Sequence, residues 1–158
     1  MSILFLLLSQ RQIMETSYEW IPECYYRVSA KALIKNEEWK FLLGKEKKYW
    51  DIPGGWVDHG EDIHSSLQRE IMEEMWIKIK NISHQPVYTF LGESSWIASP
   101  KRPLCIVIFE VVLENFNFIP SDEFQDFKFF DLQEALDKIE LYHPNKKIFW
   151  EILRIKTT

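Results

Sequence analysis

Three glutamates are spaced so that together they could bind a metal ion. Glu70, Glu73 and Glu74 stand at positions i, i+3 and i+4, and a helix turning about 100° per residue places them on one face. Like charges this close destabilise a helix by about 0.2–0.5 kcal/mol per pair, and Arg69, four residues before Glu73, neutralises only part of the cluster. A divalent cation would neutralise the rest, and carboxylate oxygens favour Mg²⁺ or Mn²⁺ over zinc.

The elements that must position these carboxylates are a helix and a glycine turn. Apolar residues that recur every four positions predict a helix over residues 62–75, with a buried stripe beside the carboxylate face. Pro53-Gly54-Gly55 ends the short extended segment before it, because proline and two glycines interrupt regular structure. The buried stripe consists of Ile63, Leu67, Ile71 and Met75.

The rest of the chain alternates between predicted strands and predicted helices. Residues 104–113 are the most apolar run and are expected to form a central strand buried on both faces. Amphipathic patterns predict helices over residues 132–140 and 145–156. Helices interleaved with strands indicate an α/β or α+β protein in which helices cover a mixed sheet. The other predicted strands are residues 25–35, 39–44, 50–53 and 127–130, with one or two more within 77–91.

Composition and charge exclude several classes of protein. The length of 158 residues fits one domain, and an apolar fraction of 46% is enough to bury a core, which excludes general disorder. A net charge of −5 provides no basic field for non-specific nucleic-acid binding. That charge is local, because six acids and one base lie between residues 58 and 74. Cys24 and Cys105 are expected to be reduced thiols, which points to the cytoplasm.

The first residues are expected to lie outside the domain. Residues 1–20 are interpreted as an N-terminal extension, and residues 21–158 as a single domain. The apolar run from Ile3 to Leu8 has six residues and lacks a basic n-region; it is far shorter than the ~20 residues that span a bilayer. We therefore expect no membrane association. One interpretation is that the functional start follows residue 13; a signal peptide is the less favoured alternative.

The segment from Gly55 to Ile77 resembles the Nudix box. That pattern is glycine, five residues, glutamate, seven residues, Arg-Glu, a hydrophobic residue, any residue, Glu-Glu, any residue, glycine and a hydrophobic residue. Residues 50–55 are also similar to the aromatic-x-x-Pro-Gly-Gly sequence that precedes the box in this family. The box positions are filled by Gly55, Glu61, Arg69, Glu70, Ile71, Glu73, Glu74 and Ile77, while Trp76 replaces the last glycine.

The resemblance implies both a fold and an activity. The implied fold is a Nudix-like α/β/α sandwich with a central mixed β-sheet. The implied activity is that of a pyrophosphohydrolase that uses Mg²⁺ or Mn²⁺ to cleave a diphosphate bond in a nucleoside diphosphate-linked or nucleotide-like substrate. The physics agrees, since a carboxylate cluster would repel a diphosphate unless metal ions lay between them. Homodimers are common in the family, so a homodimer is an assembly that the resemblance allows.

The resemblance also implies which residues bind metal. Carried over by position, Glu70, Glu73 and Glu74 are metal-binding carboxylates. The backbone carbonyl of Gly55 is a further expected ligand, in a glycine loop that can approach an ion closely. Glu70 or a glutamate from a later loop would act as the general base.

Other residues are expected to complete the site or hold it in place. Glu123, in a later acidic loop, is the expected additional carboxylate, and Glu110 is the alternative. Arg69 would hold a neighbouring box glutamate, and Glu61 would hold the loop against the helix.

Trp76 is the one departure from the box, and it leaves rival functions open. The family glycine lies just past the helix, where a left-handed cap is common, and tryptophan costs about 1 kcal/mol there unless the turn is rebuilt. The rival is a catalytically weak or inactive nucleotide-binding or sensor module. A third hypothesis is isomerisation of a small diphosphate. The intact Arg-Glu-x-x-Glu-Glu set favours hydrolysis. Trp50, Trp56 and Trp96 are candidates to stack on a base.

Overall fold

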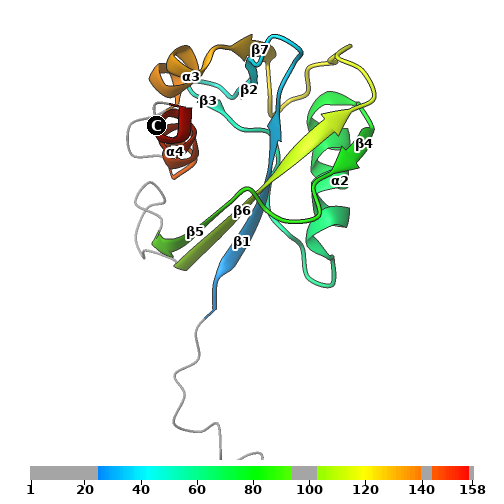
Figure 1. The fold of residues 1–158 in the computed structure, drawn as a ribbon. Helices are drawn as coiled ribbons and strands as arrows, with labels where there is room; N and C mark the ends of the chain where they lie inside the picture. The colour runs from blue at the N-terminus through cyan, green and yellow to red at the C-terminus, as the bar shows by residue number, and fades with distance from the viewer. Residues whose placement is uncertain (1–24, 94–102, 140–143, 157–158) are drawn as a thin grey trace, which may run out of the picture.

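Two sheets form the centre of the molecule (Figure 1). The computed structural model describes residues 25–93, 103–139 and 144–156. The expected N-terminal extension, Cys24 and Trp96 lie outside these described residues. Among the described residues, one sheet has four strands and the other has three.

The four-stranded sheet is mixed and is organised around β6 (Pro103–Leu113). β1 (Arg27–Ile34) runs parallel to β6 along its whole length. β4 (Ile79–Ile82) and β5 (Tyr88–Glu93) pair with β6 antiparallel on its other side. The predictions of a mixed sheet and of a central strand at 104–113 are therefore confirmed, and the pattern within 77–91 resolves into two strands.

The three-stranded sheet is antiparallel and holds the segment that leads to the glycine turn. β2 (Phe41–Lys45) lies between β3 (Trp50–Asp51) and β7 (Asp126–Phe130). The chain after β3 then runs beside β1, where the amide of Ala30 donates to the carbonyl of Gly55 at 2.9 Å. The glycine turn is thus fixed between the two sheets.

Helices cover both faces of the four-stranded sheet, as the α/β/α prediction requires (Figure 1). On one face, α2 (Ile63–Met75) packs against β1 and β6 in the same apolar cluster. On the other face, α3 (Leu132–Lys138) and α4 (Lys146–Lys156) share a second cluster with β6. No helix in the described segments is long and apolar enough to cross a membrane.

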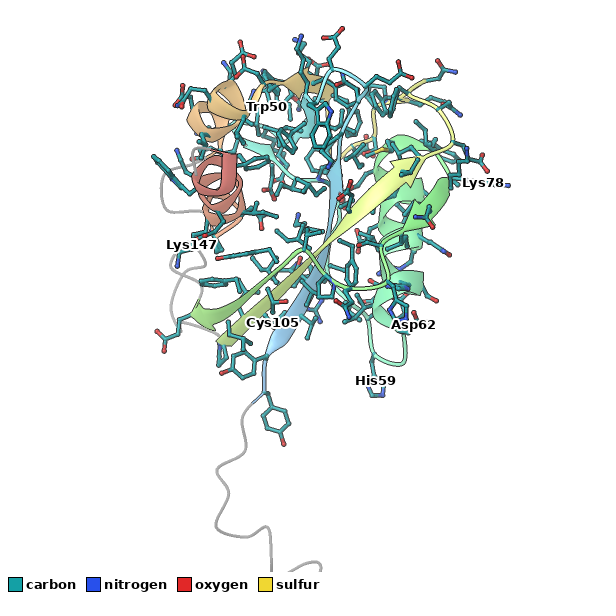
Figure 2. The ribbon with its side chains drawn as sticks, in the orientation of Figure 1. Trp50, His59, Asp62, Lys78, Cys105 and Lys147 are labelled. Atoms are coloured by element: carbon teal, nitrogen blue, oxygen red, sulfur yellow. The ribbon has the colours of Figure 1, made fainter. Side chains whose placement is uncertain are left out.

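Burial of the predicted apolar stripe anchors α2. Leu67, Ile71 and Met75 are fully buried, and burial of each such side chain contributes about 1.5–3 kcal/mol. Asp62 caps the start of the helix (Figure 2), where its side chain accepts a hydrogen bond from the amide of Ser65 at 3.0 Å. The helix is therefore held at its first turn and along its inner face, and its carboxylates have a defined position.

The end of α2 keeps the left-handed cap expected of a glycine, although the residue is tryptophan. Trp76 has φ 58° and ψ 34°, and its amide donates to the carbonyl of Met72 at 3.0 Å. The residue is 63% exposed. The turn is not rebuilt, and the helix reaches Met75, so the substitution leaves the carboxylate-bearing turns intact.

We expect Trp76→Gly to stabilise the protein by about 1 kcal/mol, because glycine adopts the left-handed conformation without strain. Urea unfolding of both proteins measures the change. Trp39→Gly is the matched comparison: Trp39 also has φ 60°, but the ammonium of Lys35 lies 4.4 Å from its ring. Trp39→Gly loses that contact, so the gain in stability from this variant should be smaller. Destabilisation by Trp76→Gly would contradict the strain argument.

Candidate active site

Arg69 connects the glycine turn to the carboxylates of α2. Its guanidinium donates two hydrogen bonds to Glu61, at 2.8 and 2.9 Å, one to Glu70 at 2.8 Å and one to Glu73 at 3.1 Å. It also donates to the carbonyl of Trp56 at 3.0 Å. The bond from Arg69 is the main reason that the pKa of Glu61 falls to about 2. One cation therefore orients three acids and the loop before the helix.

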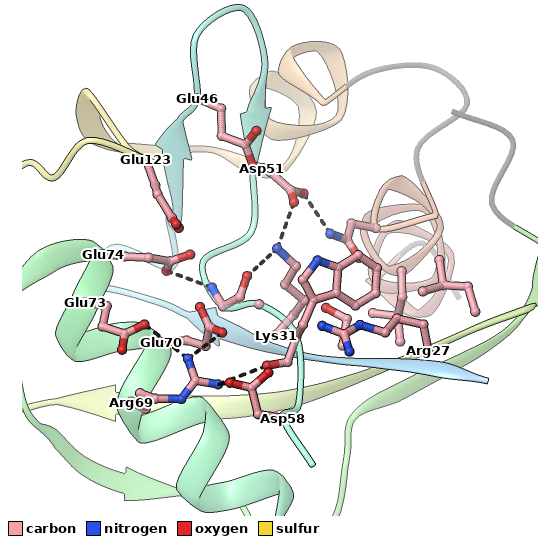
Figure 3. A pocket seen from close by; sticks show the side chains of 17 residues that line it. Arg27, Lys31, Glu46, Asp51, Asp58, Arg69, Glu70, Glu73, Glu74 and Glu123 are labelled. Carbon is pink, nitrogen blue, oxygen red and sulfur yellow. Dashed lines mark hydrogen bonds and ion pairs between the residues drawn. The ribbon is translucent and has the colours of Figure 1, made fainter. Parts of the chain in front are cut away.

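Two of the three glutamates on α2 are buried, and the third is not. The residues Glu70 and Glu74 are 9% and 2% exposed, whereas the side chain of Glu73 is 58% exposed and rests on Arg69. Glu123, from the loop before β7, completes the inner group instead. One carboxylate oxygen from each of Glu70, Glu74 and Glu123 lies within 4.8 Å of the others (Figure 3).

The glycine turn fits tightly against these carboxylates. The amide of Gly54 donates to Glu74 at 2.8 Å, and Gly54 has φ +112°, which disfavours any residue with a side chain. A Cβ on Gly55 would collide with the carboxyl group of Glu70. The two adjacent glycines therefore let one turn contact both buried acids.

The carbonyls of the glycine turn are already engaged. The Gly55 carbonyl, expected as a metal ligand, accepts from the Ala30 amide of β1 at 2.9 Å. The Gly54 carbonyl accepts from the ammonium of Lys31 at 2.5 Å. A carbonyl oxygen has a second lone pair, so either could accept a further partner.

A buried polar network lies behind the turn, and the sequence patterns did not predict it. Lys31 is 9% exposed and forms an ion pair with Asp51 at 3.0 Å. The side-chain amide of Asn145, at the start of α4, donates to the other oxygen of Asp51 at 2.7 Å. A lysine inside the apolar pattern of β1 was the available signal, because a buried charge requires a partner. Its partners could not be named, since they come from distant segments.

Burial sets the electrostatics of the site. It raises the pKa of Glu74 to about 8, against the opposing charge of Lys31 and the hydrogen bond from Gly54. Burial also raises the pKa of Glu70, opposed by Arg69. Burial alone would lower the pKa of Lys31, but the Asp51 and Glu74 carboxylates outweigh it, so the net shift is upward.

The donor set fits a hard divalent cation. Glu70, Glu74 and Glu123 offer carboxylate oxygens alone, which are the ligands that Mg²⁺ and Mn²⁺ prefer. Without such an ion, burial raises the pKa of Glu74 and so favours its protonated form. A bound cation would favour the charged form of the same carboxylate.

The carboxylates lie at one end of a cavity of about 430 Å³, a size typical of small-molecule sites. Arg27 and Ser29 of β1 and Trp56, after the glycine turn, also line the cavity. Figure 3 shows Arg27 on the side of the cavity away from Glu74 and Glu123. Glu110, the alternative to Glu123, is not among the lining residues and instead pairs with Lys35 at 2.8 Å.

The fold is an α/β/α sandwich, and its site is a capped helix that presents carboxylates to a double-glycine turn. Together they indicate the class of protein. The NUDIX domain model matches residues 25–151, and the chain belongs to that family. The resemblance drawn from residues 55–77 is thereby confirmed. A putative 8-oxo-dGTP diphosphatase from Bacillus subtilis is 43% identical over 51 residues, which are 31% of this chain and 34% of that relative. The aligned segment thus spans about a third of the relative's length.

Solved structures share the fold over most of the chain. The MutT protein from Methanosarcina mazei superposes with a TM-score of 0.70 and 22% identity, covering 87% of this chain and 99% of its own. The dihydroneopterin triphosphate pyrophosphohydrolase of E. coli superposes with a TM-score of 0.62 and 17% identity, covering 82% and 97%. These likenesses confirm the Nudix-like α/β/α architecture.

The metal-free protein should lose stability as the pH rises between about 5 and 8. The folded protein keeps a proton on Glu74 up to its pKa of about 8, whereas the unfolded chain releases it near the ordinary value of 4.5. The stabilisation is therefore complete below pH 4.5 and lost through pH 8. Urea unfolding in a chelator at pH 5, 6.5 and 8 should show this slope in the wild type, and Glu74→Gln should reduce it.

The control for that experiment is Glu114→Gln, which removes an exposed acid and should leave the slope unchanged. Adding Mg²⁺ should stabilise the wild type more at pH 8 than at pH 6, because the ion competes with the proton. An unchanged slope in Glu74→Gln would show that another group is responsible.

Lys31→Met should destabilise the protein by about 3 kcal/mol, because it leaves the buried Asp51 without its cation. The double variant Lys31→Met with Asp51→Asn should lose less stability than the sum of the losses in the two single variants. A double-mutant cycle by urea unfolding measures the coupling. Strictly additive losses would mean that the pair contributes nothing.

Proposed function

We propose that this protein is a pyrophosphohydrolase that uses Mg²⁺ or Mn²⁺ to cleave a diphosphate bond in a nucleotide-like substrate. The observation that carries the proposal is the meeting of Glu70, Glu74 and Glu123 at one end of a cavity. Membership of the NUDIX domain family supports it.

When bound there, the divalent cation would neutralise the diphosphate, polarise a phosphorus–oxygen bond and lower the pKa of an attacking water. Glu70, Glu74 and Glu123 would hold it, and Glu73 and the Gly55 carbonyl are the further ligands that we propose. Arg69 would orient Glu70 through their 2.8 Å hydrogen bond.

A carboxylate must take the proton of the attacking water as the water reaches phosphorus. Glu70 or Glu123 is the proposed general base, because both lie in the inner carboxylate group. Glu74 is less suited to this role, because it is the more deeply buried of the two helix carboxylates in this group and accepts from the amide of Gly54.

The rival function, a sensor that binds a nucleotide without cleaving it, has no specific support in the geometry. Trp76 was its sequence basis, but the helix retains its left-handed cap and its carboxylates despite that residue. Likewise, no particular observation supports isomerisation of a small diphosphate.

The B. subtilis relative makes 8-oxo-dGTP the first substrate to test. We also propose a cytoplasmic location, which the free thiol of Cys105 supports. A homodimer stays a prediction from the family resemblance.

We expect hydrolysis of at least one member of a panel of 8-oxo-dGTP, dGTP and ADP-ribose with Mg²⁺ or Mn²⁺, measured by product release. Glu70→Gln, Glu73→Gln and Glu74→Gln should each lower kcat/KM by about 100-fold or more, because each removes a charge or a base from the site. Glu114→Gln should keep wild-type activity.

Two results would contradict this proposal. Nucleotide binding without turnover of any panel member would favour the sensor. Full activity of the glutamine variants would refute the metal assignment.

A further inference from the structure

The cavity has a second end whose chemistry differs from that of the carboxylates. Arg27, Ser29 and Lys31 alternate along β1 and line the cavity together. Because a strand rises about 3.3 Å per residue, the row extends about 13 Å from Lys31 to Arg27. Lys31 lies beside the glycine turn, so Arg27 marks the outer end of the cavity (Figure 3).

Arg27 lies on an aromatic ring at this outer end. Its guanidinium carbon is 5.1 Å from the centre of the Trp56 ring, a distance typical of a cation–π contact. Within the part of the chain that the structure describes, Arg27 makes no ion pair with a carboxylate. Its guanidinium therefore has no carboxylate partner among the described residues that a ligand would have to displace.

The backbone of Trp56 is held in place by the same residues that organise the carboxylates. Its carbonyl accepts hydrogen bonds from Arg69 at 3.0 Å and from Ser66 at 3.2 Å. The segment also forms a β-bridge between Ser29 and Trp56. The backbone at the outer end is thus hydrogen-bonded to the residues that organise the inner end.

The floor at the outer end is apolar. Leu104 and Ile106 of β6 line the cavity and pair in register with Arg27 and Ser29 of β1. An arginine stacked on tryptophan above aliphatic side chains is a surface on which a flat, polar-edged ring binds, because bases stack on aromatic rings and on guanidinium planes.

We propose that Arg27 and Trp56 form a platform for the nucleobase of the substrate, a role that rests on the proposed diphosphate hydrolysis at the inner end. The substrate then lies along β1, with its phosphates toward Glu70 and Glu74 and its base on Arg27. Diphosphates that lack a base are therefore poor ligands.

Calorimetry with Mg²⁺ tests the platform without turnover. The probes are the α,β-methylene analogues of GTP and ATP, and base-free methylenediphosphonate. Trp56→Leu and Arg27→Met should each weaken binding of at least one nucleotide analogue about tenfold or more, and leave methylenediphosphonate binding within about twofold. Arg27→Lys keeps the charge but not the planar group, so it should also bind the nucleotide weakly.

The matched control is Lys128→Met. Lys128 lies 5.8 Å from the ring of Trp50, but neither residue lines the cavity, so the variant should bind every probe as the wild type does. Arg27 is exposed, so its variants should fold, which circular dichroism checks. Equal losses for nucleotide and base-free probes, unchanged nucleotide binding in both variants, or full binding by Arg27→Lys would each overturn the platform.

The platform and the proposed hydrolysis can fail separately. If the wild type binds the analogues through Arg27 and Trp56 but cleaves no substrate, the platform stands and the hydrolysis fails. If it cleaves nucleotides while both variants keep the wild-type KM, the hydrolysis stands and the platform is wrong.

Discussion

The burial of two carboxylates on the inner side of α2 is the constraint on which the rest of the site depends. An ionised carboxylate out of water is costly unless charges or hydrogen bonds compensate it. Arg69 compensates Glu70, while the Gly54 amide and the charge of Lys31 compensate Glu74. The negative charge that remains uncompensated is the reason that this site suits a divalent cation.

This constraint explains why the turn needs glycines and why Trp76 does not disturb the carboxylates. The turn must bring a backbone amide to Glu74 and leave space for Glu70, which a residue with a Cβ prevents. Trp76, by contrast, is exposed and lies beyond the last buried turn of the helix. Its strain therefore acts on stability and leaves the carboxylates where they are.

The two ends of the cavity share one frame. Arg69 contacts both the inner carboxylates and the carbonyl of Trp56, and β1 carries Lys31 at one end and Arg27 at the other. A change at Arg69 would consequently disturb both ends, whereas Arg27 can vary with little effect on the acids. Under the proposed function, this arrangement would separate the chemistry of the diphosphate from the recognition of what is attached to it.

The sequence by itself determined the elements and the local part of the site. Helical periodicity predicted α2 and its buried stripe, and the box pattern placed Glu70, Glu73, Glu74 and Arg69 close together, because these relations span only a few residues of one helix. Tertiary structure decided which acids meet: Glu123 joins the inner group, while Glu73 remains exposed on Arg69. It also joined Lys31, Asp51 and Asn145. Single-sequence periodicity carries no information on such pairings, because they depend on how the two sheets and α4 pack together.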